Sequence, residues 1–333
     1  MKFDFDSVFS FEHLYSACKN CYKGVNWKTS TQNYKLNAIC NVAKTYQELY
    51  AGTYKSKGFY KFIIRERGKV RQIKSIHISE RVVQKCLCDY CLTPILSNSL
   101  IYDNGACLKG KGLYFTTNRL KAHLQQYFRH NKTNCGYVLT FDFSKFFDSI
   151  PHKQLKEKVA RKIEDEKVRS LYNYFVDQFG SVGLGLGSQI SQISALFYTN
   201  DFDHFIKEKL KIKYFGRYMD DGYLIHNDKE YLKQCQKTII EMAKEMGLII
   251  NQKKTRISRI EDGFMFLNRH WKLTPKGYVK TKPSHETIVR IKRKRRKLLK
   301  IAKPEHLLTF DRSVLGFLKF YKNERLIDYV IQT

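Results

Sequence analysis

The stretch Tyr214–His226, YFGRYMDDGYLIH, holds two adjacent carboxylates, Asp220 and Asp221, between two apolar segments. The apolar segments on either side predict a strand–turn–strand hairpin with the acidic pair at its tip. Neighbouring carboxylates repel each other and cost stability unless a cation lies close to them. A hard divalent cation prefers oxygen ligands, so this stretch predicts a metal-dependent site.

A second candidate strand lies upstream, where residues 137–142 read YVLTFD and end on Asp142. Taken alone, Asp142 is equally consistent with a structural cap. Together with the acidic pair 78 residues later, it completes a set of three carboxylates at strand ends. Such a set can hold two metal ions about 3.5–4 Å apart, which favours phosphoryl transfer by a nucleotidyltransferase or a nuclease.

The composition indicates a globular chain with a polyanionic partner. Hydrophobic residues make up 43% of the 333 residues, which excludes a disordered chain and allows about two domains. Only 5 Pro and 18 Gly exclude collagen-like or linker-type sequence. The 61 Lys and Arg against 31 Asp and Glu give a net charge of +30, and nucleic acid is the usual partner of such an excess.

The N-terminal stretch and the cysteines bear on location. Asp4 and Asp6 interrupt the apolar start, and no run of about 18 apolar residues follows, so we expect a cytoplasmic protein with no membrane partner. Nine cysteines, an odd number, favour reduced thiols. The CxxC pairs Cys18/Cys21 and Cys88/Cys91 are consistent with zinc ligands or with buried thiols on helix faces, and both interpretations stay open.

Strands alternate with longer helices along the chain, which predicts an α/β or α+β layer. A basic hairpin is expected at 59–65 and 70–76 around Gly68, followed by a helix at 79–92 with Ser79 as its N-cap and Pro94 at its end. Short strands are expected within 248–271 and helices in the last 45 residues. Further helices are predicted at 34–50, 115–129, 152–178, 188–210 and 228–246.

Several motifs resemble those of reverse transcriptases. Tyr218-Met219-Asp220-Asp221 resembles their YxDD box, and residues 142–147, DFSKFF, resemble the DxxxxF box of the same palm. The resemblance extends from about residue 27 to about residue 300. Residues 186–192, LGSQISQ, fit LGxxxSQ, a form similar to that in diversity-generating retroelement enzymes, which belong with compact bacterial and phage enzymes related to group II introns. Some antiphage-defence reverse transcriptases share this motif.

This resemblance implies an α+β, right-hand polymerase fold. The fingers would cover residues 1–136. The palm, an antiparallel sheet with helices on one face, would cover 137–275, with a glycine-rich loop and helix near 180–210 returning toward the fingers. A short, basic helical thumb would cover 276–333.

The resemblance also implies the catalytic residues. Asp142 and Asp220 would hold two Mg²⁺ ions, which Mn²⁺ could replace, with Asp221 in support and the backbone carbonyl of Phe143 as a further ligand. Lys254, in the stretch NQKKT, would be the general acid that protonates pyrophosphate. A solvated surface lysine is the alternative for Lys254.

Nucleotide-binding residues follow from the same resemblance. Lys69 and Arg71 would clamp the triphosphate, and Arg71 is favoured because guanidinium binds phosphate oxygens two at a time. Phe143 and Phe147 would contact the nucleotide, with Phe147 excluding a 2′-hydroxyl, and Gln192 would face the nascent base pair. A core aromatic and an ordinary polar helix residue are the alternatives for Phe147 and Gln192.

Two further features surround this nucleotide site. The segment VGLGLG at 182–187 has GxGxG rather than GxGxxG spacing, so we reject dinucleotide binding and expect its backbone to approach the incoming nucleotide. Asp148 is expected to cap the following helix.

Primer and template contacts are the third implied set. Leu108 stands where relatives carry Arg, and Lys109 or Lys111 is expected to replace it. Asn268 replaces the glycine of the primer grip, since Asn also tolerates a left-handed turn. The basic thumb helix would bind phosphates without reading sequence, with a solvated basic face as the alternative. The full set is Arg81, Lys109, Lys111, Tyr218, Met219, Leu267, Asn268, Arg293, Arg295 and Arg296.

The function implied is that of an RNA-directed DNA polymerase. It would copy a structured RNA from a DNA or RNA primer with deoxynucleoside triphosphates, with errors at adenines of a template repeat and with a small basic accessory protein. One alternative is antiphage defence with a non-coding RNA. Another is a non-catalytic RNA-binding module, whose signature would be loss of a metal carboxylate, but all three carboxylates are present.

Overall fold

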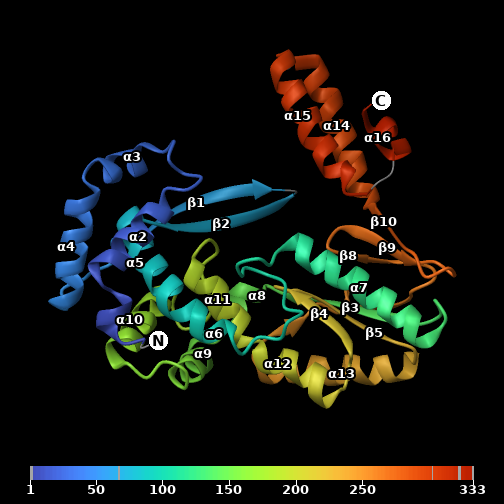
Figure 1. The fold of residues 1–333 in the computed structure, drawn as a ribbon, viewed down its shortest axis with the longest axis horizontal. Helices are drawn as coiled ribbons and strands as arrows, with labels where there is room; N and C mark the ends of the chain where they lie inside the picture. The colour runs from blue at the N-terminus through green and yellow to red at the C-terminus, as the bar shows by residue number, and fades with distance from the viewer. Residues whose placement is uncertain (1–2, 67, 302, 322–323, 332–333) are drawn as a thin grey trace.

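The computed structural model describes residues 3–66, 68–301, 303–321 and 324–331, without the side chains of residues 66, 69, 71, 324–326 and 331. Helices gather at the N-terminal end, a twisted sheet lies at the other end, and the C-terminal helices rise above the sheet (Figure 1). This is the right-hand polymerase arrangement of fingers, palm and thumb, and it confirms the predicted fold class.

The palm is an antiparallel sheet built around β3 (Tyr137–Ser144). On one side β3 pairs with β5 (Asp221–His226), which pairs in turn with β4 (Tyr214–Tyr218). On its other side β3 pairs with β7 (Arg256–Arg259) along its first half and with β6 (Ile249–Ile250) at its end. The strand that ends near Asp142 is therefore the centre of the sheet.

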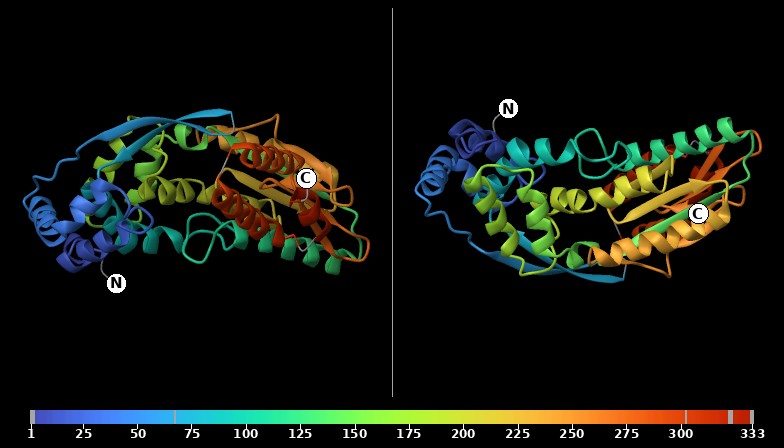
Figure 2. Two further views of the ribbon diagram at one scale, coloured as in Figure 1. Left: turned by 90° about the horizontal axis from the view of Figure 1, so that it is seen from above. Right: turned by 90° about the horizontal axis from the view of Figure 1, so that it is seen from below.

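Helices cover both faces of the sheet, not one face as predicted, because successive side chains of the strands point alternately into two apolar clusters. Leu139, Phe141 and Phe143 point into the large core that also holds apolar residues of α13 (Lys229–Glu245). Val138 and its neighbours on β5 pack against α7 (Leu113–Asn131). The helices α13 and α7 consequently lie on opposite sides of the sheet, as Figures 1 and 2 show.

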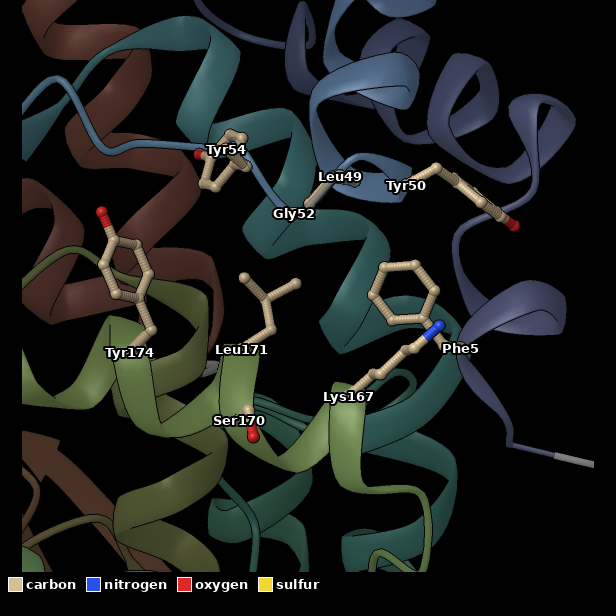
Figure 3. Close-up of a pocket in the computed structure, with 9 residues that line it drawn as sticks. All are labelled: Phe5, Leu49, Tyr50, Gly52, Tyr54, Lys167, Ser170, Leu171 and Tyr174. Carbon is tan, nitrogen blue, oxygen red and sulfur yellow. The ribbon is translucent and has the colours of Figure 1, made fainter.

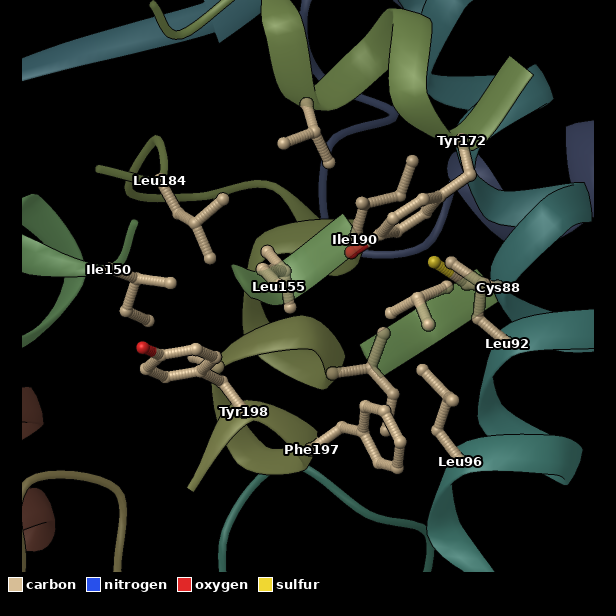
Figure 4. Packing of buried hydrophobic residues seen from close by; sticks show 14 of the residues in the cluster. Cys88, Leu92, Leu96, Ile150, Leu155, Tyr172, Leu184, Ile190, Phe197 and Tyr198 are labelled. Atoms are coloured by element: carbon tan, nitrogen blue, oxygen red, sulfur yellow. The ribbon is translucent and has the colours of Figure 1, made fainter. Parts of the chain in front are cut away.

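The fingers combine N-terminal helices with helices from the middle of the chain. Their shared core draws Cys88, Leu92 and Leu96 against Ile190 and Tyr172 (Figure 4). The hairpin of β1 (Phe59–Glu66) and β2 (Lys69–Ile76) leaves this core and extends toward the thumb (Figure 1). The helices are α1 (Phe5–Val8), α2 (Phe11–Cys21), α3 (Thr29–Leu36), α4 (Ala38–Tyr50), α5 (Ile78–Leu87), α6 (Thr93–Ser97), α9 (His152–Ala160), α10 (Glu166–Asp177) and α11 (Gln189–Tyr198).

Two predicted helix limits are wrong. The N-cap of α5 is His77, whose side chain accepts a hydrogen bond from Ser79 N, so Ser79 already lies inside the helix. Pro94 does not end the helix, because the π-helical turn Cys88–Leu92 carries the chain directly into α6, with Pro94 in its first turn. Proline is tolerated in a first helical turn, where its missing N–H leaves no donor unpaired.

Two long predicted helices are divided. The segment 152–178 forms α9 and α10, because Asp165 caps a new helix by accepting from Val168 N. The segment 188–210 forms α11, α12 (Asn200–His204) and the π-helical turn Phe205–Lys209.

The thumb follows a small antiparallel sheet of β8 (Phe264–Phe266), β9 (Arg269–Leu273) and β10 (Val279–Pro283). Residues 279–283 are therefore a strand paired with β9 rather than part of the helical tail. The thumb helices α14 (His285–Ile301), α15 (Pro304–Lys319) and α16 (Glu324–Ile331) have a small apolar core of their own. The Arg269 guanidinium, 3.8 Å from the Phe320 ring, ties this unit to β9.

An apolar pocket of about 330 Å³ lies among the fingers helices (Figure 3). Four aromatic rings and one lysine contribute to it, and none of Asp142, Asp220 and Asp221 does. The pocket is lined by Phe5, Leu49, Tyr50, Gly52, Tyr54, Lys167, Ser170, Leu171 and Tyr174.

Among the described residues, no helix is both long and apolar enough to cross a membrane.

The two CxxC pairs lie within the fingers core. Cys18, Cys21, Cys88 and Cys91 are buried free thiols. Burial raises the pKa of Cys21 and of Cys91 to about 12, which disfavours the thiolate that zinc requires. Because all four thiols pack among apolar side chains of the large core, the structure favours buried apolar thiols over zinc ligands.

Candidate active site

The sheet brings Asp142 and Asp221 directly opposite each other. They are register partners on β3 and β5, so their side chains leave the same face of the sheet. Asp220 occupies the tip of the β4–β5 hairpin, and its carbonyl accepts from Phe143 N at 3.0 Å. Asp142 thus meets the adjacent pair Asp220 and Asp221, 78 residues further along the chain, at the end of the central strand.

Lys254 joins this group from the loop between β6 and β7. The loop is fixed to the end of β3, because Asn251 N donates to Asp142 O at 2.8 Å and Lys254 N donates to Asn251 O at 3.1 Å. Lys254 Nζ then lies 2.7 Å from Asp142 Oδ2. The hydrogen bond to Asp142 raises the pKa of Lys254, so its ammonium form is favoured.

The surroundings of Asp221 disfavour its ionised form. Burial, followed by the charges of Asp220 and Asp142, raises the pKa of Asp221 to about 7. Lys254 opposes this rise but does not cancel it. A cation bound beside Asp221 would favour its ionised form and lower this pKa.

The donor set fits magnesium, although it is not a closed cage. Within the described part of the chain, no group of three or more His, Cys, Asp or Glu side chains is arranged to hold an ion as it stands. Mg²⁺ commonly takes only one or two protein carboxylates and completes its shell with water and substrate phosphates. The open set of Asp142, Asp220 and Asp221 matches this habit, and Lys254 would have to yield its place on Asp142.

An apolar cluster supports the acidic turn from below. Met219 is 9% exposed and packs with Ala106 and Leu196, and partly buried Leu108 and Phe147 lie against this group. The side chain of Met219 is therefore turned into the protein, although the sequence placed it among the primer and template contacts. Leu108 stands where a cation was expected because its role here is to pack in this cluster.

The two adjacent phenylalanines have different environments. Phe146 is buried in the large core and stacks on Phe143, itself buried there, whereas Phe147 is half-buried beside the acidic turn. Phe147 therefore lies near the acidic turn, and its predicted exclusion of a 2′-hydroxyl stays a prediction. Asp148 does not cap the following helix, because it lies inside α8 (Phe146–Ser149) and the N-cap of α9 is Pro151.

The glycine-rich loop packs tightly on α8. Leu184 N donates to Phe147 O at 2.7 Å, and a Cβ on Gly183 would come within 2.9 Å of Asp148 O. Gly183 also has a φ of +88°, so this backbone contact by itself requires glycine, and the expected approach of the loop to the nucleotide stays a prediction. Ser188 caps α11 as expected, and its hydroxyl donates to Gln84 Oε1 on α5 at 2.9 Å.

A cavity of about 420 Å³ separates this loop from the fingers hairpin. Val70, Gln72 and Lys74 of β2 line one side, and residues 182–186 line the other. The side chains of Lys69 and Arg71 lie outside the described residues, so their predicted contacts with the triphosphate stay predictions. Gln192 is half-buried on the first turns of α11.

The predicted template contacts differ in their availability. Arg81 is half-buried on α5, and Lys109 is exposed. Lys111 is committed elsewhere, because its Nζ donates to Tyr102 O at 2.8 Å and to Asn104 O at 3.0 Å. Lys111 therefore holds a loop together, and Lys109 is the better candidate for a template contact. Tyr218 is half-buried beside Met219.

The predicted primer grip is a tight turn between β8 and β9. Leu267 and Asn268 both have left-handed backbones, with φ of 50° and 60°, as a two-residue hairpin turn with two positive φ angles requires. Asn268 is exposed, and its carbonyl accepts from Ser284 N at the start of the thumb. The expected left-handed conformation of Asn268 is confirmed.

The three thumb arginines are not equivalent. Arg293 and Arg296 are exposed on α14. Arg295 is directed to α15, where its Nε and Nη2 lie 3.0 and 3.2 Å from the carboxylate oxygens of Asp311. The structure therefore assigns Arg295 to the packing of the thumb rather than to phosphate binding.

Sequence analysis missed a buried pair beneath the acidic turn. Arg217 on β4 and Asp203 on α12 are both fully buried and joined by two hydrogen bonds of 2.6 and 2.7 Å. The available signal was an arginine in the middle of the apolar strand 214–218. Its partner was not evident, because Asp203 sits in a different element.

Fold and site together place the chain in the class of right-hand polymerases. Residues 54–271 match the family described as reverse transcriptase (RNA-dependent DNA polymerase). Because this match covers well over half of the chain, the protein belongs to the reverse transcriptase family.

Individual relatives are distant. Protein YkfC of Escherichia coli (strain K12) is 22% identical over 256 residues, covering 62% of this chain and 64% of that protein. Among solved structures, apo telomerase from Candida tropicalis truncated from its C-terminal domain is 17% identical with a TM-score of 0.51, covering 67% of this chain and 55% of that chain. Telomerase from Candida albicans in complex with the TWJ fragment of telomeric RNA is 12% identical with a TM-score of 0.54, covering 83% and 56%. The chain thus spans less than two thirds of the length of each.

Proposed function

We propose that the protein is an RNA-directed DNA polymerase. The observation that carries the proposal is the meeting of Asp142, Asp220 and Asp221 at one end of the palm sheet, with Lys254 in contact with Asp142. Membership of the reverse transcriptase family supports RNA as template and deoxynucleoside triphosphates as substrates.

Asp142 and Asp220 would hold magnesium, with Asp221 and the Phe143 carbonyl in support. Bound magnesium would promote attack of the primer 3′-hydroxyl on the α-phosphate and stabilise the leaving oxygen. Lys254 would donate a proton to the departing pyrophosphate, since its ammonium form is favoured beside the carboxylates. Phe147 would exclude the ribose 2′-hydroxyl, and Gln192 would contact the nascent pair.

The nucleic acid would lie between palm and thumb. Arg293 and Arg296 on the thumb, Asn268 at the primer grip and Lys109 near the acidic turn are exposed residues suited to backbone contacts. The net charge of +30 supports a polyanionic partner of considerable length. A cytoplasmic bacterial or phage setting, and a small basic accessory protein, are further parts of the proposal.

Two biological roles remain in competition. The SQ form of residues 186–192 favours a diversity-generating retroelement, in which copying introduces errors at template adenines. Antiphage defence with a non-coding RNA is the alternative. Sequencing of the DNA product distinguishes them, because errors concentrated opposite adenines support diversification, while accurate or repetitive DNA supports defence.

The activity is tested by primer extension on an RNA template with Mg²⁺ and all four deoxynucleotides. The wild-type protein is expected to extend the primer, and Asp220→Asn is expected to abolish extension while RNA binding persists. Asp262→Asn, on an exposed turn away from the site, is the matched control and should extend normally. Unchanged extension by Asp220→Asn would refute the assignment, and RNA binding by a wild type that never extends would favour the RNA-binding module.

A further inference from the structure

Arg217 makes a set of contacts that ends on the acidic turn. Its Nε and Nη2 bind both carboxylate oxygens of Asp203 at 2.6 and 2.7 Å, and both residues are fully buried. Its remaining terminal nitrogen, Nη1, donates to Met219 O at 2.6 Å. The guanidinium thus spans from α12 to the residue immediately before Asp220.

The turn held in this way is strained. Tyr218 pairs with Asp221, so Met219 and Asp220 form a two-residue hairpin loop, and Met219 alone of the two has a positive φ, of 54°. A two-residue loop with positive φ at its first position favours glycine there. Methionine accepts this backbone only where its surroundings enforce it, and the contact to its carbonyl is such a restraint.

The second restraint comes from the loop before α7. Arg217 N donates to Asp103 O at 3.1 Å, and Gly105 N donates to Arg217 O at 2.9 Å, so this loop pairs with β4 like an added strand. The loop is held in turn through the Asp103 carboxylate, which accepts from Arg119 at 2.6 Å and from Lys207 at 3.0 Å. Arg217 is therefore fixed along both its backbone and its side chain.

Stability does not account for this arrangement. A buried ion pair recovers little more than the cost of taking its charges out of water, and apolar residues of similar size often serve the fold equally well. What apolar residues cannot supply is a donor directed at Met219 O. The contact to the carbonyl is therefore the feature that requires an arginine at position 217.

We propose that Arg217, anchored by Asp203, is a positioning residue that holds the Met219–Asp220 turn so that Asp220 and Asp221 face Asp142. This inference rests on the proposed polymerase function, since it concerns the same carboxylates. The alignment of the three carboxylates would then depend on a charge pair that lies on the opposite face of the sheet.

The test replaces the pair by apolar residues, in the double variant R217M/D203L. We expect it to fold, with an unchanged circular dichroism spectrum and cooperative melting. We expect its apparent affinity for Mg²⁺, measured by the metal-induced shift in melting temperature, to fall by about 10–100-fold, as for other partners that orient metal ligands. The kcat for extension should fall similarly, with little change in KM for the nucleotide. D201N, which alters an exposed carboxylate on the same helix α12 that pairs with Lys158 of α9, is the matched control and should leave both readouts unchanged.

A double-mutant cycle then asks whether Arg217 acts through the turn. M219G relieves the demand for a positive φ, so the loss of Mg²⁺ affinity caused by R217M/D203L should shrink by about tenfold or more in the M219G background. Additive effects of the two changes, or unaltered Mg²⁺ affinity in a folded R217M/D203L, would overturn the inference. The Mg²⁺-induced shift in melting temperature does not need turnover. A wild type that binds Mg²⁺ but never extends a primer would therefore refute the proposed function, while the role of Arg217 would still be decided by the Mg²⁺ affinities of the variants.

Discussion

Lys254 Nζ lies 2.7 Å from Asp142 Oδ2, so the proposed general acid is in direct contact with the proposed metal ligand. The two groups come from different segments, the end of β3 and the loop before β7. The contact explains how a half-exposed lysine is held at the site, and it gives the lysine an alternative partner whenever a metal takes the carboxylate.

Lys254→Met is expected to slow single-turnover nucleotide addition by about 10²–10⁴-fold, the range for loss of a general acid. Primer–template affinity should change little, because one exposed charge is a small part of the basic surface. The matched control is Lys253→Met, which alters the neighbouring exposed lysine. Equal losses in both variants, seen by rapid-quench kinetics, would contradict a specific role for Lys254.

Stabilisation by Mg²⁺ should depend on pH through Asp221. The pKa of Asp221 in the folded chain is about 7, above its ordinary value of 3.8, so ionised Asp221 destabilises the metal-free fold above pH 7 and this penalty fades as the pH falls toward 4. Mg²⁺ binds the ionised form, so its effect on the melting temperature should be larger at pH 8 than at pH 6.

The control for this effect is Asp221→Asn. It should raise the melting temperature of the metal-free protein at pH 8, by about 2–4 °C for each kcal/mol of penalty removed. It should also flatten the difference between the two pH values. An identical Mg²⁺ effect at pH 6 and pH 8 in the wild type would show that Asp221 is not part of the metal site.

Phe147→Ala is expected to admit ribonucleotides. Removal of the half-buried ring beside the acidic turn should lower the preference for deoxynucleotides by about 10²-fold, measured as the ratio of kcat/KM values. Phe146→Leu is the control, since Phe146 is a core residue whose change should cost about 0.5–3 kcal/mol of stability without altering sugar choice. Sugar selection that follows Phe146 instead would reassign the gate.

The exposed thumb arginines should be visible in salt titrations. Arg293→Gln and Arg296→Gln are each expected to reduce the slope of log affinity against log salt by about 1 for a template–primer duplex. Arg295→Gln should leave that slope unchanged and instead lower the melting temperature, because Arg295 is paired with Asp311. A slope that changes only with Arg295 would reverse this assignment.

The sequence was informative where short-range pattern decides structure. The apolar segments around Asp220 and Asp221, and the strand ending on Asp142, predicted the central strands of the palm and the convergence of the carboxylates. The fingers hairpin followed equally from alternation around Gly68. In each case the signal lies within a few residues of the feature it predicts.

The parts that escaped prediction depend on partners far away in the chain. Lys111 and Arg295 read as free cations until the structure supplies the carbonyls and the carboxylate that they bind. Pro94 read as a helix end because nothing local shows that a π-helical turn precedes it. The sequence shows Arg217 as a charged residue within an apolar strand. Its role could not be predicted, because it depends on contacts with Asp203 and with the carbonyl of Met219.

The central position of β3 has a consequence for how the protein comes to be made. Its neighbours β5, β6 and β7 all follow it in the chain, so on the ribosome β3 emerges well before any strand that pairs with it. Asp142 is synthesised before Asp220, and both are synthesised before Lys254, so the set of four residues is complete only after residue 254. A nascent chain released before residue 254 therefore carries Asp142, Asp220 and Asp221 but lacks Lys254 and β7, and its candidate site is incomplete.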